Sequence, residues 1–269
     1  MTVNGEPRPY SSAVAVERAA DLLFLIAERG EVSLGDLGRA IGSSGSAVHR
    51  ILTALKNKGL IQQSVENGPY SMSWSILALT RRMLAEVDLR SLSLPPMIGL
   101  RDLTGETVTL NVRSGFQRVC IDQVESTQEV SWRQDVGSVT PLYAGATGKV
   151  LMAYLSKADL GEFFRQVKLE KLTPSTITRR DDLIKELAQV RKNGYAIGEQ
   201  DRLLGVAGIA APIFDSAGNA AGTLTIAGPA ERCSQELRAE WVEPLTAATE
   251  HISRMVADAA IGPRVPAAC

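Results

Sequence analysis

The N-terminal quarter of the chain alternates between stretches with helical spacing of apolar residues and short polar turns. Residues 13–29 repeat apolar side chains along one face of an amphipathic helix, and Gly30 is a typical stop signal. A second, short helix is expected over residues 34–41, because Ser33 is a favourable N-cap residue and Asp36 suits the first turn of a helix. The pattern therefore predicts two consecutive helices.

A third helix is predicted within residues 43–61, SSGSAVHRILTALKNKGLI, and its two faces differ in chemistry. The apolar face has the i, i+3, i+4, i+7 spacing and consists of Val48, Ile51, Leu52 and Leu55. The opposite face carries compact hydrogen-bonding side chains: Ser46, Arg50, Thr53 and Asn57. Gly59 is expected to end this helix.

Two short strands, at residues 60–64 and 70–74, are expected to form a hairpin across Asn67-Gly68, since Asn-Gly favours tight hairpin turns. Three helices followed by a two-stranded hairpin is the layout of a winged helix-turn-helix. In this motif the second helix of the pair enters the major groove of DNA, where Ser, Thr and Arg side chains reach base edges and phosphates. The pattern predicts double-stranded DNA as a partner.

Two other interpretations of the polar face stay open. A polar face rich in Ser and Thr also suits a solvated helix surface, and winged-helix domains also serve as protein-interaction modules. Charge does not decide between them, because the first 75 residues contain seven Lys or Arg and seven Asp or Glu. Helix N-terminal amides near residues 44–46 can nevertheless bind a phosphate without net positive charge. His49 by itself suits a flanking or packing position better than base recognition.

After the hairpin, residues 75–89 are expected to form a linker helix whose Leu/Met stripe can pair with a second copy of the chain. Pro95-Pro96 marks a break or a helix start. A mixed α/β pattern follows. Strands are expected at residues 108–112, 119–124, 129–138, 195–200, 206–214 and 220–227. Helices are expected after Gly145 and at residues 157–167, 179–194 and 234–258, and Pro244 should bend the last one.

Composition excludes several classes of protein. The 269 residues suffice for two domains with cores, 45% are hydrophobic, 22% are charged, and the formal net charge is −1. No apolar run approaches the ~20 residues that span a bilayer, and the N-terminus lacks the apolar stretch of a secretory signal. We therefore expect a cytoplasmic protein with no membrane partner.

The few cysteines and histidines also limit the chemistry. Cys120, Cys233 and Cys269 lie far apart without C-x-x-C spacing, which suits a reducing compartment and argues against disulfides or a zinc site. Only His49 and His251 could supply imidazole. We expect no metal and no cofactor. A cysteine enzyme is a competing hypothesis with little support, because no histidine can be placed beside Cys120 or Cys233 and no G-x-S-x-G motif occurs.

Several stretches together resemble the IclR family of bacterial transcriptional regulators. They include AVERAADLLFLIAERG near the N-terminus, ETVTLNVRSG, VGSVTPLYAGATGKVLMAYL and GVAGIAAPIFDSAGNAAGTLTIAGP. Their order and spacing are specific, and the resemblance extends from Ala13 to about Ile261. It implies an α+β protein with an N-terminal winged helix-turn-helix domain, a linker helix and a C-terminal GAF-like α/β effector-binding domain.

We accordingly expect five segments. They are a tail (1–12), the DNA-binding domain (13–74), the linker helix (75–89), the effector-binding domain (90–262) and a second tail (263–269). The resemblance further implies a homodimer or dimer of dimers on a palindromic operator, controlled by a small organic or aromatic acid. It also implies a regulator, not an enzyme. We expect a repressor rather than an activator, acting on a catabolic operon.

The recognition helix departs from the family at two positions. Where the family often has Pro-Lys-Ser-Thr-Val-His-Arg, this chain has SGSAVHR, so that Gly45 and Ala47 replace Lys and Thr while Ser46, His49 and Arg50 match. Operator sequence therefore cannot be transferred. The residues expected to contact DNA are Ser33, Ser44, Gly45, Ser46, Ala47, His49, Arg50 and Thr53.

The expected effector site follows from the family's Gly-Lys helix start, kept here as Gly148-Lys149. Free amides at this helix N-terminus suit a carboxylate, although small residues there also permit tight packing. Gly208 and Ala227 stand where the family uses Cys and Ser, which predicts a larger and more apolar pocket for an aromatic or branched ligand. The expected effector-binding residues are Cys120, Trp132, Tyr143, Gly145, Ala146, Thr147, Glu199, Asp201, Gly208, Thr225 and Ala227. For Cys120, Trp132 and Tyr143, core packing is an equal alternative.

Overall fold

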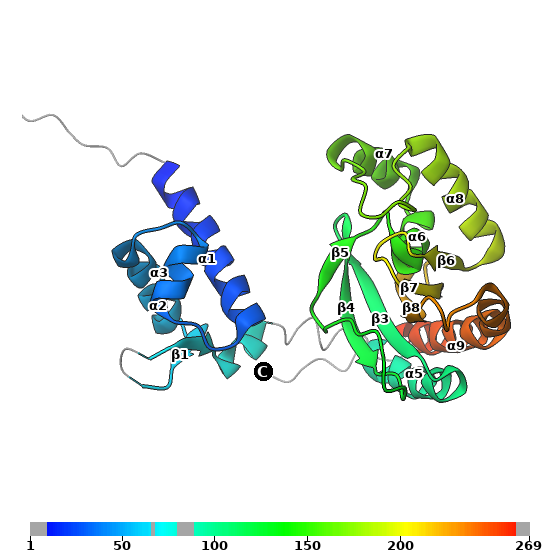
Figure 1. Ribbon diagram of the computed structural model, residues 1–269, viewed down its shortest axis with the longest axis horizontal. Coiled ribbons are helices and arrows are strands. Elements are labelled where there is room, and N and C mark those ends of the chain that lie inside the picture. The colour runs from blue at the N-terminus through cyan, green and yellow to red at the C-terminus, as the bar shows by residue number, and fades with distance from the viewer. Residues whose placement is uncertain (1–9, 66–67, 80–88, 262–269) are drawn as a thin grey trace, which may run out of the picture. The chain divides into compact units, whose positions relative to one another are not determined.

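The chain divides into two compact units, Met1–Glu86 and Val87–Cys269 (Figure 1). The computed structural model describes residues 10–65, 68–79 and 89–261. The division falls within the segment expected to be a linker helix, most of which lies outside the described residues. No helix in the described ranges combines the length and apolar character needed to cross a membrane.

The N-terminal unit contains the predicted three helices and hairpin. The helices are α1 (Tyr10–Arg29), α2 (Leu34–Ala40) and α3 (Gly45–Asn57), and the antiparallel strands are β1 (Ile61–Gln63) and β2 (Tyr70–Met72). Of the expected Asn67-Gly68 turn, Asn67 lies outside the described residues.

The end of the hairpin differs from the sequence prediction. A 3-10 helix, η1 (Trp74–Ile76), follows β2, so the expectation that the second strand reaches Trp74 is wrong. The hydroxyl of Ser73 accepts a hydrogen bond from the amide of Ser75 and caps η1. This local cap competes with continued strand pairing.

One apolar cluster fixes the orientation of α3. Val48, Leu52 and Leu55 of α3 are buried against residues of the other four elements and the segment between α1 and α2: Leu22, Ile26, Val32, Leu37, Ile61 and Tyr70. Each buried side chain of this size contributes roughly 1.5–3 kcal/mol. The cluster therefore holds the opposite, polar face of α3 toward solvent.

The C-terminal unit is built around a six-stranded antiparallel sheet of order β5-β4-β3-β8-β7-β6 (Figure 1). Its strands are β3 (Thr107–Ser114), β4 (Gln117–Val124), β5 (Val139–Pro141), β6 (Ala196–Glu199), β7 (Val206–Phe214) and β8 (Ala220–Pro229). The helices are α5 (Leu89–Thr104), α6 (Gly145–Ala153), α7 (Lys157–Gln166), α8 (Arg180–Asn193) and α9 (Gln235–Ile261).

Both faces of the sheet are covered. On β7, Ile209 and Ala211 belong to the core shared with α5 and α9, whereas Ala210 belongs to the core shared with α6, α7 and α8. Because successive side chains of a strand point to opposite faces, α6 lies on the face opposite to α5 and α9. Double coverage also explains why β7 is an almost continuous apolar run.

Two further predictions were wrong. Residues 129–138 are irregular, not a strand, because side chains anchor them in place of ladder bonds. Thr107 Oγ1 donates to Trp132 O at 2.6 Å, and Gln134 N donates to Gln123 Oε1 at 2.7 Å. Pro95 and Pro96 also lie inside α5 instead of breaking it. The sequence pattern did not include the packing of α5 against β3 and α9, which holds the helix despite the missing backbone donors.

Candidate functional sites

The polar face of α3 is exposed as the sequence pattern predicts. Ser46, Arg50 and Thr53 are all exposed, and so are Ser44, Gly45 and His49, whereas Ala47 is half-buried. Within the described residues the exposed side chain of Arg50 forms no ion pair or hydrogen bond. This face is thus available to a partner, and its side chains are the small and cationic types that suit a DNA groove.

The N-termini of α2 and α3 both begin at a serine N-cap, but only one serine acts as a side-chain cap. Ser33 Oγ accepts a hydrogen bond from Asp36 N at 3.2 Å and donates to Asp36 Oδ2 at 2.6 Å. This contact with Ser33, followed by those with Arg39, lowers the pKa of Asp36. Ser44 makes no such cap bond, and its Oγ lies 3.3 Å from Ser46 Oγ.

The first amides of α3 are consequently left without a side-chain acceptor. Helix N-terminal amides carry partial positive charge and bind phosphate oxygens well. At the N-terminus of α2, by contrast, the side chain of Ser33 already accepts a hydrogen bond from the amide of Asp36. The two serines thus differ in role, with Ser33 maintaining α2 and Ser44 free to face an anion.

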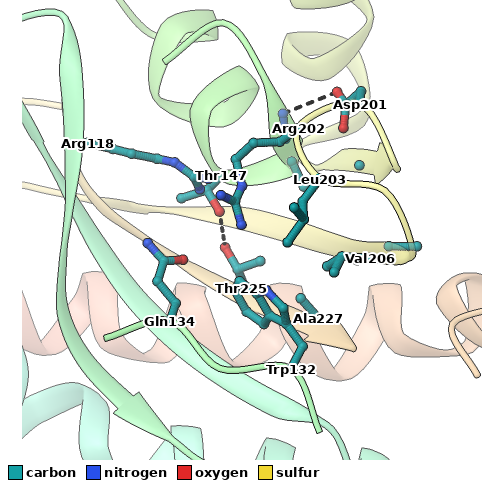
Figure 2. A pocket seen from close by; sticks show the side chains of 15 residues that line it. Arg118, Trp132, Gln134, Thr147, Asp201, Arg202, Leu203, Val206, Thr225 and Ala227 are labelled. Atoms are coloured by element: carbon teal, nitrogen blue, oxygen red, sulfur yellow. Dashed lines mark hydrogen bonds between the residues drawn. The ribbon is translucent and has the colours of Figure 1, made fainter. Parts of the chain in front are cut away.

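The C-terminal unit contains a cavity of about 40 Å³ between the start of α6, strands β7 and β8, the loop after β6 and the segment around Trp132 (Figure 2). Eight residues expected at the effector site line it: Trp132, Gly145, Ala146, Thr147, Asp201, Gly208, Thr225 and Ala227. The cavity also has lining residues that sequence reasoning missed: Arg118, Gln134, Gly198, Arg202, Leu203, Val206 and Ala207.

Three expected residues do not line this cavity. Cys120 is buried with its Sγ 3.4 Å from Asp122 O, and burial raises the pKa of its thiol to about 11. Tyr143 packs into the apolar core around α6. Glu199 is half exposed and forms an ion pair with Arg238. Each has a structural role elsewhere that its position in the sequence did not reveal.

Arg118 is the most unusual group in the cavity. It is 2% exposed on β4, and its Nε donates to Thr140 Oγ1 at 2.7 Å. Within the described ranges it forms no ion pair with a carboxylate. Burial, followed by the nearby positive charge of Arg202, lowers the pKa of Arg118 to about 9, so the side chain remains cationic at neutral pH. The sequence contained a signal for this position. Arg118 lies two residues before Cys120 on β4, so the alternation of a strand places both side chains on the same, buried face.

Asp201 does not neutralise Arg118, because other groups already hold its carboxylate. Asp201 Oδ2 accepts a hydrogen bond from Gly145 N at 3.2 Å (Figure 2). It also pairs with Lys149 Nζ at 3.0 Å. Lys149 Nζ also donates to Ile197 O at 2.7 Å and pairs with Glu186 Oε1 at 3.2 Å. Asp201 therefore fixes the start of α6, and its direct ion pair is with Lys149, which Glu186 shares.

The remaining walls are mixed in character. Thr147 Oγ1 and Thr225 Oγ1 are hydrogen-bonded at 2.8 Å, which joins α6 to β8 (Figure 2). The guanidinium carbon of Arg202 lies 5.8 Å from the centre of the Trp132 ring, a cation–π distance. The walls of the cavity thus include two guanidinium groups beside apolar side chains.

Gly208 also has a packing role that the sequence analysis did not include. A Cβ at this position would lie 2.4 Å from Ile226 O and 2.8 Å from Ala227 Cβ. The missing side chain allows β8 to approach β7 closely, and Gly208 also lines the cavity. The expectation that Gly208 enlarges the pocket relative to other family members stays a prediction. Across the described residues no three His, Cys, Asp or Glu side chains are grouped so that they could hold a metal ion.

Two protein-family models match the chain. The IclR helix-turn-helix domain matches residues 15–64, and the model described as bacterial transcriptional regulator IclR C-terminal matches residues 81–254. Among curated proteins, the HTH-type transcriptional repressor AllR of Escherichia coli (strain K12) is 28% identical over 232 residues, which cover 86% of this chain and 86% of AllR.

Solved structures agree with the fold. The crystal structure of the Thermotoga maritima IclR has a TM-score of 0.72 and 28% identity, covering 91% of this chain and 99% of that one. An IclR homolog from Microbacterium hydrocarbonoxydans, crystallised with 4-hydroxybenzoate, has a TM-score of 0.77 and 22% identity, covering 90% and 98%. The fold class predicted from the sequence is thereby confirmed.

Proposed function

The chain belongs to the IclR family of bacterial transcriptional regulators, and from this premise we propose that it is an acid-responsive repressor of a catabolic operon. The family consists of DNA-binding regulators with a helix-turn-helix and an effector-binding domain, not of enzymes. In the proposal, α3 binds the operator, and a small organic or aromatic acid in the cavity beside α6 modulates that binding.

The single observation that carries the proposed effector class is the buried cation of Arg118, which has no carboxylate partner among the described residues. A buried charge without a partner is unfavourable by several kcal/mol in general, so a protein that keeps one gains stability when an anion binds. A carboxylate fits best, because a guanidinium holds it through two parallel hydrogen bonds. The N-terminal amides of α6 supply further donors beside it.

The proposed DNA contacts rest on the exposure of the α3 face. Ser46, Arg50 and Thr53 lie on the side opposite the apolar cluster, so they can enter the major groove without disturbing the core. The free first amides of α3 are proposed to bind a backbone phosphate. Ser33 is proposed to contribute chiefly through its cap of α2.

The remaining features of the proposal extend beyond this site. Repression is supported by AllR, a relative described as a repressor. We propose a cytoplasmic homodimer or dimer of dimers, because two copies of α3 then read a palindromic operator with half-sites about 34 Å apart or a multiple of that spacing. The domain boundaries proposed are the same five segments that the sequence predicts.

The DNA-binding part is tested with Arg50→Ala in the full chain. We expect a loss of roughly 1–3 kcal/mol in operator affinity if Arg50 reads a base, measured by gel shift on DNA from upstream of the gene and its neighbours. Arg165→Ala is the control, because this α7 side chain is also well exposed. Equal operator affinity of Arg50→Ala, Arg165→Ala and the unsubstituted protein would exclude groove recognition by Arg50.

The effector part is tested by a thermal-shift screen of carboxylic acids that includes aliphatic acids and 4-hydroxybenzoate. An acid that binds the folded protein raises its unfolding temperature by mass action, and the same acid should change operator affinity. Acids that bind without any effect on operator affinity would contradict the proposal, as would a screen in which no acid raises the unfolding temperature.

A further inference from the structure

Two arginine side chains from different elements share the cavity beside α6. Arg118 comes from β4, and Arg202 comes from the loop between β6 and β7 (Figure 2). Both lie close to the first residue of α6. A Cβ on Gly145 would be 3.4 Å from Nη2 of Arg118 and 3.6 Å from Cβ of Arg202. The positive charge of Arg202 contributes to the lowered pKa of Arg118, as expected for two cations that face one space.

No carboxylate of the described residues forms an ion pair with either arginine. Asp201 lines the cavity, but its Oδ2 lies 3.0 Å from Lys149 Nζ and accepts a hydrogen bond from Gly145 N. Burial lowers the pKa of Arg202, and the charge of Asp201 only partly opposes this effect. Two like charges held together in a partly buried site repel each other strongly. Such a pair is stabilised by an anion that enters between them.

We propose that the effector of this cavity is a short dicarboxylate, with one carboxylate paired to Arg118 and the other to Arg202. This inference rests on the proposed function, because it takes the cavity to be the effector site. The inner carboxylate binds Arg118 and the amides at the start of α6. The outer carboxylate binds Arg202 on its half-buried loop, beside the ring of Trp132.

Charge and size both favour this class of ligand over a monocarboxylate. A single carboxylate neutralises one guanidinium and leaves the second without an anion, whereas a dicarboxylate neutralises both. The cavity measures about 40 Å³, and one water needs roughly 10–15 Å³ on this measure. The space between the two arginines therefore suits a short chain between the carboxylates.

The test compares acids of equal chain length on the full protein by isothermal titration calorimetry at constant ionic strength. The pairs are succinate with butyrate and glutarate with valerate. We expect the dissociation constant of at least one diacid to be about tenfold lower than that of its monoacid, because a second charge-assisted contact adds at least this much.

Arg202→Gln identifies the second anion contact and leaves the inner arginine in place. Because Arg202 lies on a loop and is only half buried, this variant is expected to fold. Its diacid preference should fall to within about twofold, while monoacid affinity changes by less than about twofold. Arg179→Gln is the control, since this exposed side chain lies next to α8 and outside the cavity lining, and it should keep the full preference.

The outcomes separate this inference from the proposed function. Monoacids that bind as tightly as diacids and still change operator affinity would overturn the dicarboxylate assignment and leave the acid-responsive regulator standing. A diacid preference that persists in Arg202→Gln would also overturn the assignment. If no monoacid and no diacid binds, the acid effector of the proposed function fails together with this inference.

Discussion

At the scale of single residues, Arg118 has opposite effects on stability and on binding. Its guanidinium is buried on β4 without a carboxylate partner among the described residues. Burial disfavours its charged form and lowers its pKa to about 9. The same charge becomes favourable when a ligand carboxylate pairs with it, because a buried charge is destabilising mainly when it has no partner of opposite charge.

We therefore expect Arg118→Gln to fold at least as stably as the unsubstituted protein in the absence of ligand. An acid at 100 times its dissociation constant should stabilise the unsubstituted protein by about 2.7 kcal/mol and should no longer stabilise the variant. Thermal unfolding with and without acid measures both effects. Arg113→Gln, an exposed position on β3, is the control. A variant that unfolds at a lower temperature but keeps the full acid effect would contradict this role.

Gly208 gives a second prediction at the residue scale. Gly208→Ala places a Cβ 2.4 Å from Ile226 O, so β8 has to move away, and we expect a loss of about 1–3 kcal/mol in the free energy of unfolding. Gly161→Ala on α7 is the matched control, because a Cβ there meets nothing within 4 Å. Urea unfolding followed by circular dichroism compares the two. Equal stability of both variants would show that the contact between β7 and β8 relaxes freely.

At the scale of elements, the two serine N-caps provide a matched pair. Ser33→Ala removes the acceptor of the Asp36 amide and should lower stability by about 1 kcal/mol, the usual effect of a lost N-cap. Ser44→Ala removes no side-chain cap bond, so we expect a smaller loss of stability. Thermal unfolding ranks the two variants. A larger loss for Ser44→Ala would contradict the assignment of Ser33 as the only side-chain cap of the pair.

Elements with a single local cause were predictable from the sequence. The helical spacing of the apolar residues was enough to predict α3. The length of the continuous apolar run was enough to predict β7, and its predicted bounds match the structure. The segment 129–138 and α5 were not predictable, because long-range contacts decide them. Thr107, far away in the sequence, anchors Trp132 through a hydrogen bond. Packing against α9 and β3 keeps α5 helical although it contains two prolines.

The candidate cavity shows the same limit. Gly145, Ala146 and Thr147 could be placed at the cavity, because the resemblance to the IclR family implies that the turn before Gly148-Lys149 lines the effector site. Arg202 could not, since it follows Asp201 in an irregular loop without any spacing signal. Its guanidinium lies at a cation–π distance from Trp132, and the segment around Trp132 was itself expected to be a strand.

At the scale of the whole molecule, the modest positive charge of the recognition region predicts a modest salt dependence of DNA binding. Three cations are exposed on or directly after α3, namely Arg50, Lys56 and Lys58. If each neutralises one phosphate in a dimer, the slope of log affinity against log salt is about −0.9 × 6, or roughly −5. Fluorescence anisotropy on operator DNA between low and moderate salt gives this slope, and a value near −10 would require a different basic surface.

The central claim is that an organic anion held by Arg118 changes how tightly the protein binds its operator. The most direct test is the operator dissociation constant, measured by anisotropy against increasing acid for the unsubstituted protein and for Arg118→Gln. We expect the acid to change the constant about fivefold or more in the first, as coupling of 1 kcal/mol or more requires. We expect no change in the second, and equal operator affinity of both proteins without acid. An identical response to acid in the two proteins would contradict the account.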